Sequence, residues 1–132
     1  MAMTVGQVMN RPVLATTLNT SVRDIASQLV ASGITGMPVA DRNGTVVGVV
    51  TEYDVVDALV AGKRLETLKA CDIMSKGAIT LDVGADLAEA LKLFKEKHII
   101  RIPITEEGKL VGILARTDAL RGILEEPEFL MF

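Results

Sequence analysis

A threonine and an aspartate at the start of a predicted helix are the side chains in this sequence best suited to chemistry. Thr51 and Asp54 stand three residues apart, directly after the strand-like run Gly48–Val50. The free amides of a helix N-terminus suit a phosphate, and a threonine hydroxyl can donate a further hydrogen bond to it. The two oxygens of an aspartate can accept hydrogen bonds from both hydroxyls of a ribose. The same spacing also makes an ordinary helix cap that needs no ligand.

A related segment lies further along the chain and departs from the first in one position. It runs Gly112-Ile113-Leu114-Ala115-Arg116-Thr117-Asp118 and keeps the aspartate. Ala115 stands where the first segment has its threonine, and Thr117 offers a hydroxyl next to Asp118. We therefore expect two sites of unequal composition.

These two segments belong to a duplication that covers most of the chain. Met9 returns as Met74 and Pro38 returns as Pro103, each 65 positions later. After a turn that is one residue shorter, the offset falls to 64, as Asp54 and Asp118 show. A fixed period of this kind is the signature of a tandem repeat.

Each half predicts the same string of elements, β-α-β-β-α. Capping residues and an apolar stripe at helical spacing predict a helix that begins near Ser21 and another that begins near Asp86. Paired apolar runs around an Asn-Gly or Glu-Gly turn predict a hairpin in each half. The expected ranges are Val13–Thr16, Gly36–Ala40, Val46–Val50 and Glu52–Ala61 in the first half, and Ala78–Leu81, Ile99–Thr105, Leu110–Leu114 and Arg116–Leu124 in the second.

The predicted fold class is α+β, with two tandem β-α-β-β-α repeats that pack sheet to sheet with pseudo-twofold symmetry. A unit of about sixty residues is marginal alone, which is why we expect the repeats to share one module. The expected organisation is a first repeat in residues 1–62, a linker in residues 63–69, a second repeat in residues 70–124 and a C-terminal tail in residues 125–132.

Composition argues against several classes of function. A net charge of −3 and a pI near 5.1 oppose binding to nucleic acid, which requires a basic face. The single cysteine, Cys71, and the single histidine cannot build the usual metal site, and no catalytic constellation is recognisable, so we expect no enzyme. The chain has neither an apolar run long enough to span a membrane nor the start of a signal peptide, so we expect a cytoplasmic protein.

The segment Gly48-Val49-Val50-Thr51-Glu52-Tyr53-Asp54 resembles the Gly-aliphatic-aliphatic-Thr-x-x-Asp signature of cystathionine-β-synthase (CBS) domains. The aliphatic-Pro-Val segment and the Met-led start of each repeat are similar to the same family, from about Met9 to Arg121. The resemblance implies a Bateman module, which is a tandem CBS pair that binds AMP, ADP, ATP or S-adenosylmethionine as a regulatory ligand. It also implies a homodimer that regulates a partner protein of unknown identity, and it implies no required cofactor.

The resemblance further implies which residues contact the adenosine-containing ligand. Arg101 falls where family members often carry a basic residue that contacts a phosphate, whereas its first-half counterpart is Gly36. The first-half set is Ala15, Thr16, Met37, Pro38, Val39, Thr51 and Asp54, and the second-half set is Thr80, Arg101, Ile102, Pro103, Thr117 and Asp118. The alternative is a structural or dimerisation module with degenerate, non-binding sites, which Ala115 and the pair Ala15 and Gly36 favour.

Overall fold

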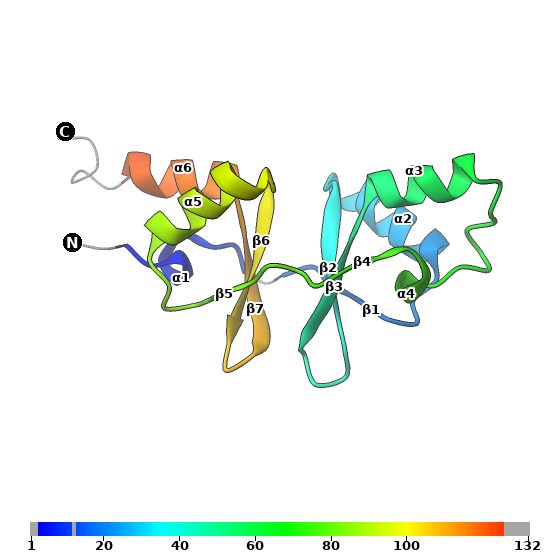
Figure 1. Ribbon diagram of the computed structural model, residues 1–132, viewed down its shortest axis with the longest axis horizontal. Coiled ribbons are helices and arrows are strands. Elements are labelled where there is room, and N and C mark those ends of the chain that lie inside the picture. The colour runs from blue at the N-terminus through cyan, green and yellow to red at the C-terminus, as the bar shows by residue number, and fades with distance from the viewer. Residues whose placement is uncertain (1–2, 12, 126–132) are drawn as a thin grey trace. The chain divides into compact units, whose positions relative to one another are not determined.

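The computed structural model of the chain describes residues 3–11 and 13–125, and it divides into two compact units that each combine a sheet with helices (Figure 1). One unit is Leu14–Ala78, and the other joins the chain up to Val13 with the chain from Ile79 onward. The predicted α+β class with two repeats is confirmed. The sheet-to-sheet packing and the repeat bounds stay predictions. Of the predicted tail 125–132, residues 126–132 lie outside the described residues.

The unit Leu14–Ala78 contains a four-stranded sheet in the order β1-β2-β3-β4. Strand β1 is parallel to β2, whereas β3 is antiparallel to both β2 and β4. Its core is a cluster of buried apolar residues from α2, α4 and the two long strands. The elements are β1 (Thr16–Thr17), α2 (Val22–Ser32), β2 (Gly36–Ala40), β3 (Val46–Thr51), α3 (Glu52–Val60), α4 (Ala70–Ile73) and β4 (Ser75–Lys76).

The other unit repeats this plan with a three-stranded sheet in the order β5-β6-β7. Strand β5 is parallel to β6, and β6 forms an antiparallel hairpin with β7. An isolated antiparallel bridge between Asn10 and Ile113 takes the place that β4 has in the first sheet. The elements are α1 (Val5–Val8), β5 (Leu81–Asp82), α5 (Leu87–Lys97), β6 (Arg101–Glu106), β7 (Lys109–Ala115) and α6 (Arg116–Glu125).

Local capping signals determine where the long helices begin. The Ser21 hydroxyl accepts a hydrogen bond from the amide of Asp24 at 3.1 Å, and α2 begins at the next residue. The Asp86 carboxylate accepts from the amide of Ala88 at 3.0 Å at the start of α5. Both predicted helix starts are confirmed, because a side chain that satisfies an otherwise free amide favours the first turn wherever it stands.

The two hairpins differ in their turns, which accounts for the change in repeat offset. In the second hairpin, Glu107 and Gly108 both adopt positive φ, 52° and 80°, and the turn is tight. In the first hairpin only Gly44 does so, with φ of 83°, and the Asp41 carboxylate accepts hydrogen bonds from the amides of Asn43 and Thr45. An aspartate that binds nearby amides supports the longer connection.

Pro38 and Pro103 lie in interior strands, although the loss of a backbone donor predicts an edge or a bulge. Pairing with β1 begins only at Val39, and pairing with β5 begins only at Ile104. Each proline therefore precedes the part of its strand that has neighbours on both sides. The register of each hairpin also shifts one residue after that point.

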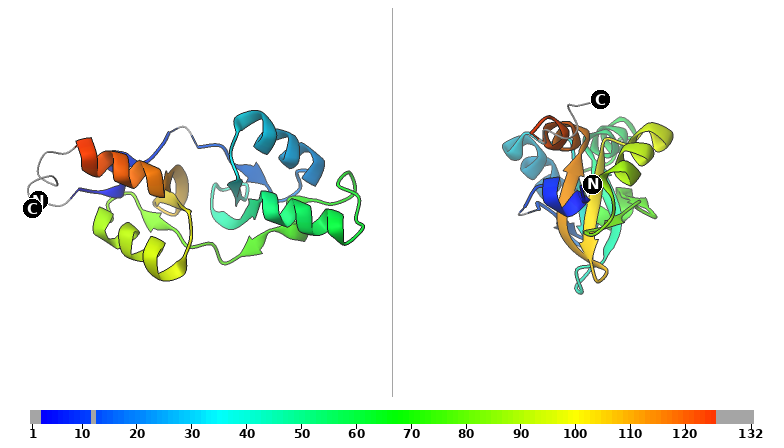
Figure 2. Two further views of the ribbon diagram at one scale, coloured as in Figure 1. Left: turned by 90° about the horizontal axis from the view of Figure 1, so that it is seen from above. Right: turned by 90° about the vertical axis from the view of Figure 1, so that its left-hand side faces the viewer.

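Two short helices, which the predicted string of elements lacked, close the two cores. Helix α1 puts Val5 into the unit from Ile79 onward, and α4 puts Ala70 into the unit Leu14–Ala78, both with no exposed surface. The amide of Val5 donates to the carbonyl of Ala85, and the amide of Ala70 donates to the carbonyl of Thr20, each at 2.9 Å. Figure 2 shows α1, in dark blue, beside the yellow-to-red elements of its unit. The segment that leads each repeat along the sequence thus packs on the unit of the other repeat.

Candidate functional site

The Thr51–Asp54 motif stands at the junction of β3 and α3 and forms a complete capping box. The Asp54 Oδ2 atom accepts hydrogen bonds from the Thr51 amide at 2.9 Å and from its hydroxyl at 3.1 Å. The amide of Asp54 donates to the Thr51 hydroxyl oxygen at 3.3 Å. Asp54 is only half-buried, and its Oδ1 atom makes no hydrogen bond within the described residues. One carboxylate oxygen therefore stabilises the helix start, and the other remains available as an acceptor.

The corresponding Asp118 is bound on both carboxylate oxygens. Its Oδ2 accepts from the amide of Ala115 at 2.7 Å. Its Oδ1 accepts from the Asn10 amide side chain at 2.9 Å and from the Arg121 guanidinium at 3.1 Å. Asp118 is only 4% exposed, so these partners compensate the loss of water around a buried charge. Both oxygens of Asp118 therefore accept hydrogen bonds from the protein.

The residues at the equivalent places around Asp54 explain the difference. Ser75 corresponds to Asn10 at the 65-residue offset, and Asp57 corresponds to Arg121 at the 64-residue offset. Ser75 and Asp57 are both exposed and make no side-chain hydrogen bond to Asp54 in the described residues. Sequence reasoning missed Asn10 and Arg121 as partners of Asp118. Two signals were available: the position of Asn10 directly after Met9, and the three-residue spacing between Asp118 and Arg121.

The second half differs from the first at Arg101 and Ala115, and these two residues lie opposite each other in one hairpin. Arg101 is the cross-strand partner of Ala115, and Gly36 is the cross-strand partner of Thr51. Opposite residues in an antiparallel pair have adjacent side chains. The first hairpin therefore offers a hydroxyl beside a glycine, and the second offers a half-buried arginine beside an alanine.

Thr16 carries an unusual polar group in the first unit. It is 5% exposed, and its hydroxyl has no hydrogen-bond partner among the described residues. It pairs with Val39 as Leu81 pairs with Ile104, so Leu81 is its counterpart in the other unit. A buried unsatisfied hydroxyl costs about 1–3 kcal/mol. The first unit thus keeps a costly hydroxyl where the other unit has an apolar side chain.

The remaining predicted residues lie on strands and helices of the two units or directly before them. The first-half residues come from β1 and the residue before it, from β2, and from the β3–α3 junction, and β1, β2 and β3 are consecutive neighbours in the sheet. Met37, Pro38 and Val39 in β2 are buried, as are Ile102 and Pro103 in β6. The others are half-buried or exposed and comprise Ala15, Thr80 and Thr117.

Gly48 in the motif has a packing role that its spacing did not reveal. A Cβ atom at Gly48 would stand 2.7 Å from the Met74 sulfur and 2.7 Å from the Ser75 carbonyl oxygen. Gly112 has the same relation to Met9 and Asn10. The absence of a side chain at each glycine lets the segment that leads the other repeat cross the strand at close range. This part of the motif is therefore needed for packing.

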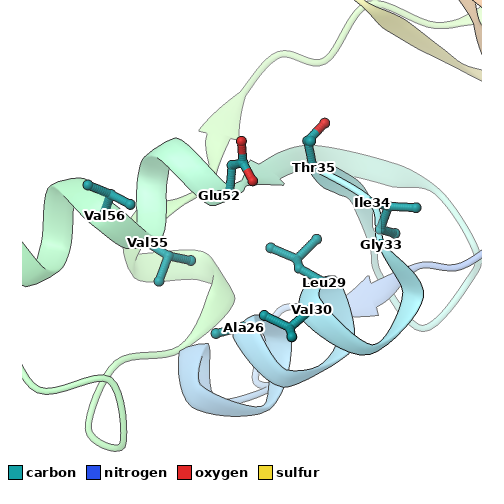
Figure 3. A pocket seen from close by; sticks show the side chains of 9 residues that line it. All are labelled: Ala26, Leu29, Val30, Gly33, Ile34, Thr35, Glu52, Val55 and Val56. Carbon is teal, nitrogen blue, oxygen red and sulfur yellow. The ribbon is translucent and has the colours of Figure 1, made fainter.

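A separate groove lies between α2 and α3, and none of the predicted ligand residues lines it (Figure 3). Its lining residues are Ala26, Leu29, Val30, Gly33, Ile34, Thr35, Glu52, Val55 and Val56. No group of three or more His, Cys, Asp or Glu residues within residues 3–11 and 13–125 is arranged to hold a metal ion. In the same part of the chain, every helix is too short or too polar to cross a membrane.

Comparison with known proteins identifies the family of this fold. The CBS domain family matches residues 5–61 and 70–125. The uncharacterized protein MK0525 of Methanopyrus kandleri is 33% identical over 122 residues, which are 91% of this chain and 62% of that protein. The chain likewise spans 57% of the chloroplastic CBS domain-containing protein CBSX2 of Arabidopsis thaliana.

Solved structures show the same architecture. CBSX2 in complex with AMP is 31% identical, with a TM-score of 0.81 over 92% of this chain and 96% of that one. The CBS domain pair of protein MJ0100 is 22% identical, with a TM-score of 0.82 over 95% of this chain and 98% of that one. With a match in each half and the fold of these pairs, the chain belongs to the CBS-domain family and carries two of its domains in tandem.

Proposed function

We propose that this chain is a regulatory module that binds an adenine nucleotide and catalyses no reaction. The observation that carries the proposal is the open Oδ1 atom of Asp54 beside the first amides of α3. A carboxylate acceptor and a helix N-terminus together suit a ribose and a phosphate. CBSX2, at 31% identity, has been crystallised with AMP, which supports the same ligand class here.

The two halves contribute unequally to this proposal. In the first half, the ligand contacts are Ala15, Thr16, Met37, Pro38, Val39, Thr51 and Asp54, and they include the Thr16 hydroxyl and the Asp54 oxygen that have no partner within the described residues. In the second half, they are Thr80, Arg101, Ile102, Pro103, Thr117 and Asp118, but Asp118 is already engaged on both oxygens. We therefore assign the stronger site to the first half.

Regulation requires that the ligand favour one arrangement of the chain over another, because a ligand with equal affinity for both shifts nothing. We propose that the chain acts as a homodimer in the cytoplasm and passes this change to a partner protein. Competition among AMP, ADP and ATP for one site would make the module a sensor of cellular energy state.

A structural or dimerisation module is the second candidate, and the closed Asp118 favours it. A carboxylate that three donors already satisfy gains little from a ribose, since a hydrogen bond exchanged for another has a small net effect. If both halves behave in this way, the chain dimerises and ignores every nucleotide.

The test is calorimetric titration of ligand-free protein with AMP, ADP, ATP and S-adenosylmethionine. We expect saturable binding of AMP, and we expect Asp54→Ala to weaken it roughly tenfold or more through the loss of hydrogen bonds to a charged acceptor. Asp57→Ala removes an exposed carboxylate from the same helix and serves as the matched control.

Three results decide between the candidates. Wild-type binding that Asp54→Ala abolishes and Asp118→Ala leaves intact supports the first-half site. Equal affinity of wild type and Asp54→Ala overturns the assignment of Asp54. The absence of both heat and thermal stabilisation with all four ligands overturns the sensor and leaves the dimerisation module.

A further inference from the structure

One carboxylate oxygen of Asp118 is occupied by a side chain from the segment that leads the first repeat. The amide side chain of Asn10 donates a hydrogen bond to Oδ1 of Asp118 at 2.9 Å, across 108 positions of sequence. Both residues belong to the unit that joins the chain up to Val13 with the chain from Ile79 onward. The contact therefore lies within one compact unit.

The backbone around Asn10 fixes this side chain in place. The Asn10 amide donates to the carbonyl of Ile113 at 2.9 Å, and the Asn10 carbonyl accepts from the amide of Ile113 at 3.2 Å. Two residues earlier, Val8 lies so close to Gly122 of α6 that a Cβ atom at position 122 would overlap it. Because the leading segment is attached to both β7 and α6, the Asn10 side chain needs little further ordering to reach Asp118.

Arg121 is the second side-chain donor to the same oxygen, and it is held less firmly. Its guanidinium lies 3.1 Å from Oδ1 of Asp118, and 60% of its side chain is exposed. An ion pair made by a solvent-exposed arginine contributes little, because water screens it and because a long side chain loses entropy when it is fixed. A ligand therefore displaces Arg121 more easily than Asn10.

The first half has the same backbone pairing with a different side chain. Ser75 pairs with Val49 as Asn10 pairs with Ile113, and the repeat relates the two pairs. The serine side chain is shorter than that of asparagine, and within the described residues it makes no hydrogen bond to Asp54. The side chain at this one position accompanies the difference between the two aspartates.

We propose that Asn10 competes with the ribose of a nucleotide for Oδ1 of Asp118 and thereby closes the second-half site. The serine at the equivalent position leaves the first-half site open. The inference rests on the nucleotide-binding function proposed above, and it names the residue that decides which half binds. A site that is mostly closed binds with an apparent affinity reduced by the fraction of open molecules.

Opening the second-half site is the first test. Asp54→Ala removes the first-half site, so calorimetric titration with AMP in this background reports on the second half. We expect Asp54→Ala to bind AMP weakly or not at all, and we expect the added Asn10→Ser substitution to tighten binding at least about tenfold. Asn43→Ser removes an exposed amide side chain from the first hairpin turn, in the other unit, and should give no gain in the same background.

A gain of affinity distinguishes competition from a purely structural role of Asn10. If the Asn10 amide only stabilised the fold, Asn10→Ser would lower the melting temperature and would not tighten binding. The gained binding should disappear again when Asp118→Ala is added, because the competition is for that carboxylate. Thermal denaturation checks that each variant folds.

The reverse exchange tests the same rule in the first half. Ser75→Asn puts an amide side chain at the position that Asn10 has relative to Asp118. We expect it to raise the AMP dissociation constant of the otherwise wild-type protein roughly tenfold. Ser75→Ala is the matched control and should stay within about twofold of wild type. Ser75 is exposed, so both substitutions leave the core intact.

The outcomes separate this inference from the proposed function. If wild type binds AMP and either exchange leaves the affinity unchanged, the competition is overturned and the nucleotide-binding module stands. If Asn10→Ser fails to fold, Ser75→Asn decides alone. Binding by the Asn10→Ser protein but not by wild type overturns the first-half site and supports the competition, whereas the absence of binding by every variant overturns both.

Discussion

At the scale of single residues, the corresponding aspartates of the two halves, Asp54 and Asp118, differ in how many hydrogen bonds they accept from the protein. Asp118 has three donors around it, including an amide side chain and a guanidinium, and it is buried. At the equivalent places around Asp54 stand Ser75 and Asp57, which do not bind it, so one oxygen of Asp54 has no hydrogen bond in the described residues. The residues at these two places thus leave one oxygen of Asp54 without a hydrogen bond in the described residues, whereas they bind the corresponding oxygen of Asp118.

Thr16 provides a prediction at this scale, because its buried hydroxyl has no partner in the described residues. Thr16→Val keeps the shape of the side chain and removes the unsatisfied group. We expect the free energy of unfolding to rise by about 1 kcal/mol, as measured by urea denaturation. If the hydroxyl contacts the nucleotide, the affinity for AMP should fall roughly tenfold in the same protein.

A Thr16→Val protein that gains stability and loses affinity for AMP indicates a ligand contact, whereas a gain in stability alone indicates a packing defect. Thr80→Val, at a half-buried threonine of the other unit, is the control and should change the unfolding free energy by less than about 0.5 kcal/mol. A Thr16→Val protein that loses stability would show that the hydroxyl is satisfied in solution and would contradict the prediction.

At the scale of elements, each hairpin is crossed by the segment that leads the other repeat. Met74 and Ser75 pass over Gly48, and Met9 and Asn10 pass over Gly112, at distances that leave no room for a Cβ atom. Short antiparallel pairing between β3 and β4 accompanies the first crossing, and the Asn10–Ile113 bridge accompanies the second. The glycines of the motif are therefore required by the fold whether or not a ligand binds.

Gly48→Ala tests this close contact. The added methyl group would overlap the Ser75 carbonyl oxygen, which belongs to the backbone and cannot rotate away as a side chain does. We expect the free energy of unfolding to fall by about 1–3 kcal/mol in urea denaturation.

Gly84→Ala is the matched control for this experiment. Its Cβ atom would meet only the flexible Asp82 carboxylate, at 3.3 Å, and its backbone φ is not positive. We expect a change within about 0.5 kcal/mol. Equal effects of the two substitutions would contradict the crossing as the reason for glycine at position 48.

At the scale of the whole molecule, a sequence repeat and a compact unit are different things. The unit Leu14–Ala78 is continuous along the chain, and it takes α4 and β4 from the start of the second repeat. The other unit takes α1 from the start of the chain. A unit of about sixty residues has a small core, so the loss of a short helix that contributes a fully buried residue, Val5 in α1 or Ala70 in α4, is a large loss.

Two fragments of equal length test this division. Residues 14–78 contain one complete unit, whereas residues 1–65 contain α1 without its core and lack Ala70 and β4. We expect residues 14–78 to show a cooperative urea transition by circular dichroism, and we expect residues 1–65 to be unfolded or to melt without cooperativity. A more stable fragment 1–65 would contradict the exchange of leading segments.

The sequence by itself determined the parts of this protein that depend on nearby residues. The Ser21 and Asp86 caps, the two hairpins and the start of α3 at Thr51 follow from signals within a few residues, which act the same way in any fold. The duplication then indicated two similar units, and the motif indicated the CBS family.

Only the tertiary structure decided which groups the aspartates meet. Asn10 reaches Asp118 across 108 positions of sequence, and Met74 reaches Gly48 because the leading segments cross between repeats. The positions that separate the open Asp54 from the closed Asp118 are Ser75 and Asp57 on one side and Asn10 and Arg121 on the other. Contacts between distant segments depend on the packing of the whole chain, and local propensity carries no information about that packing.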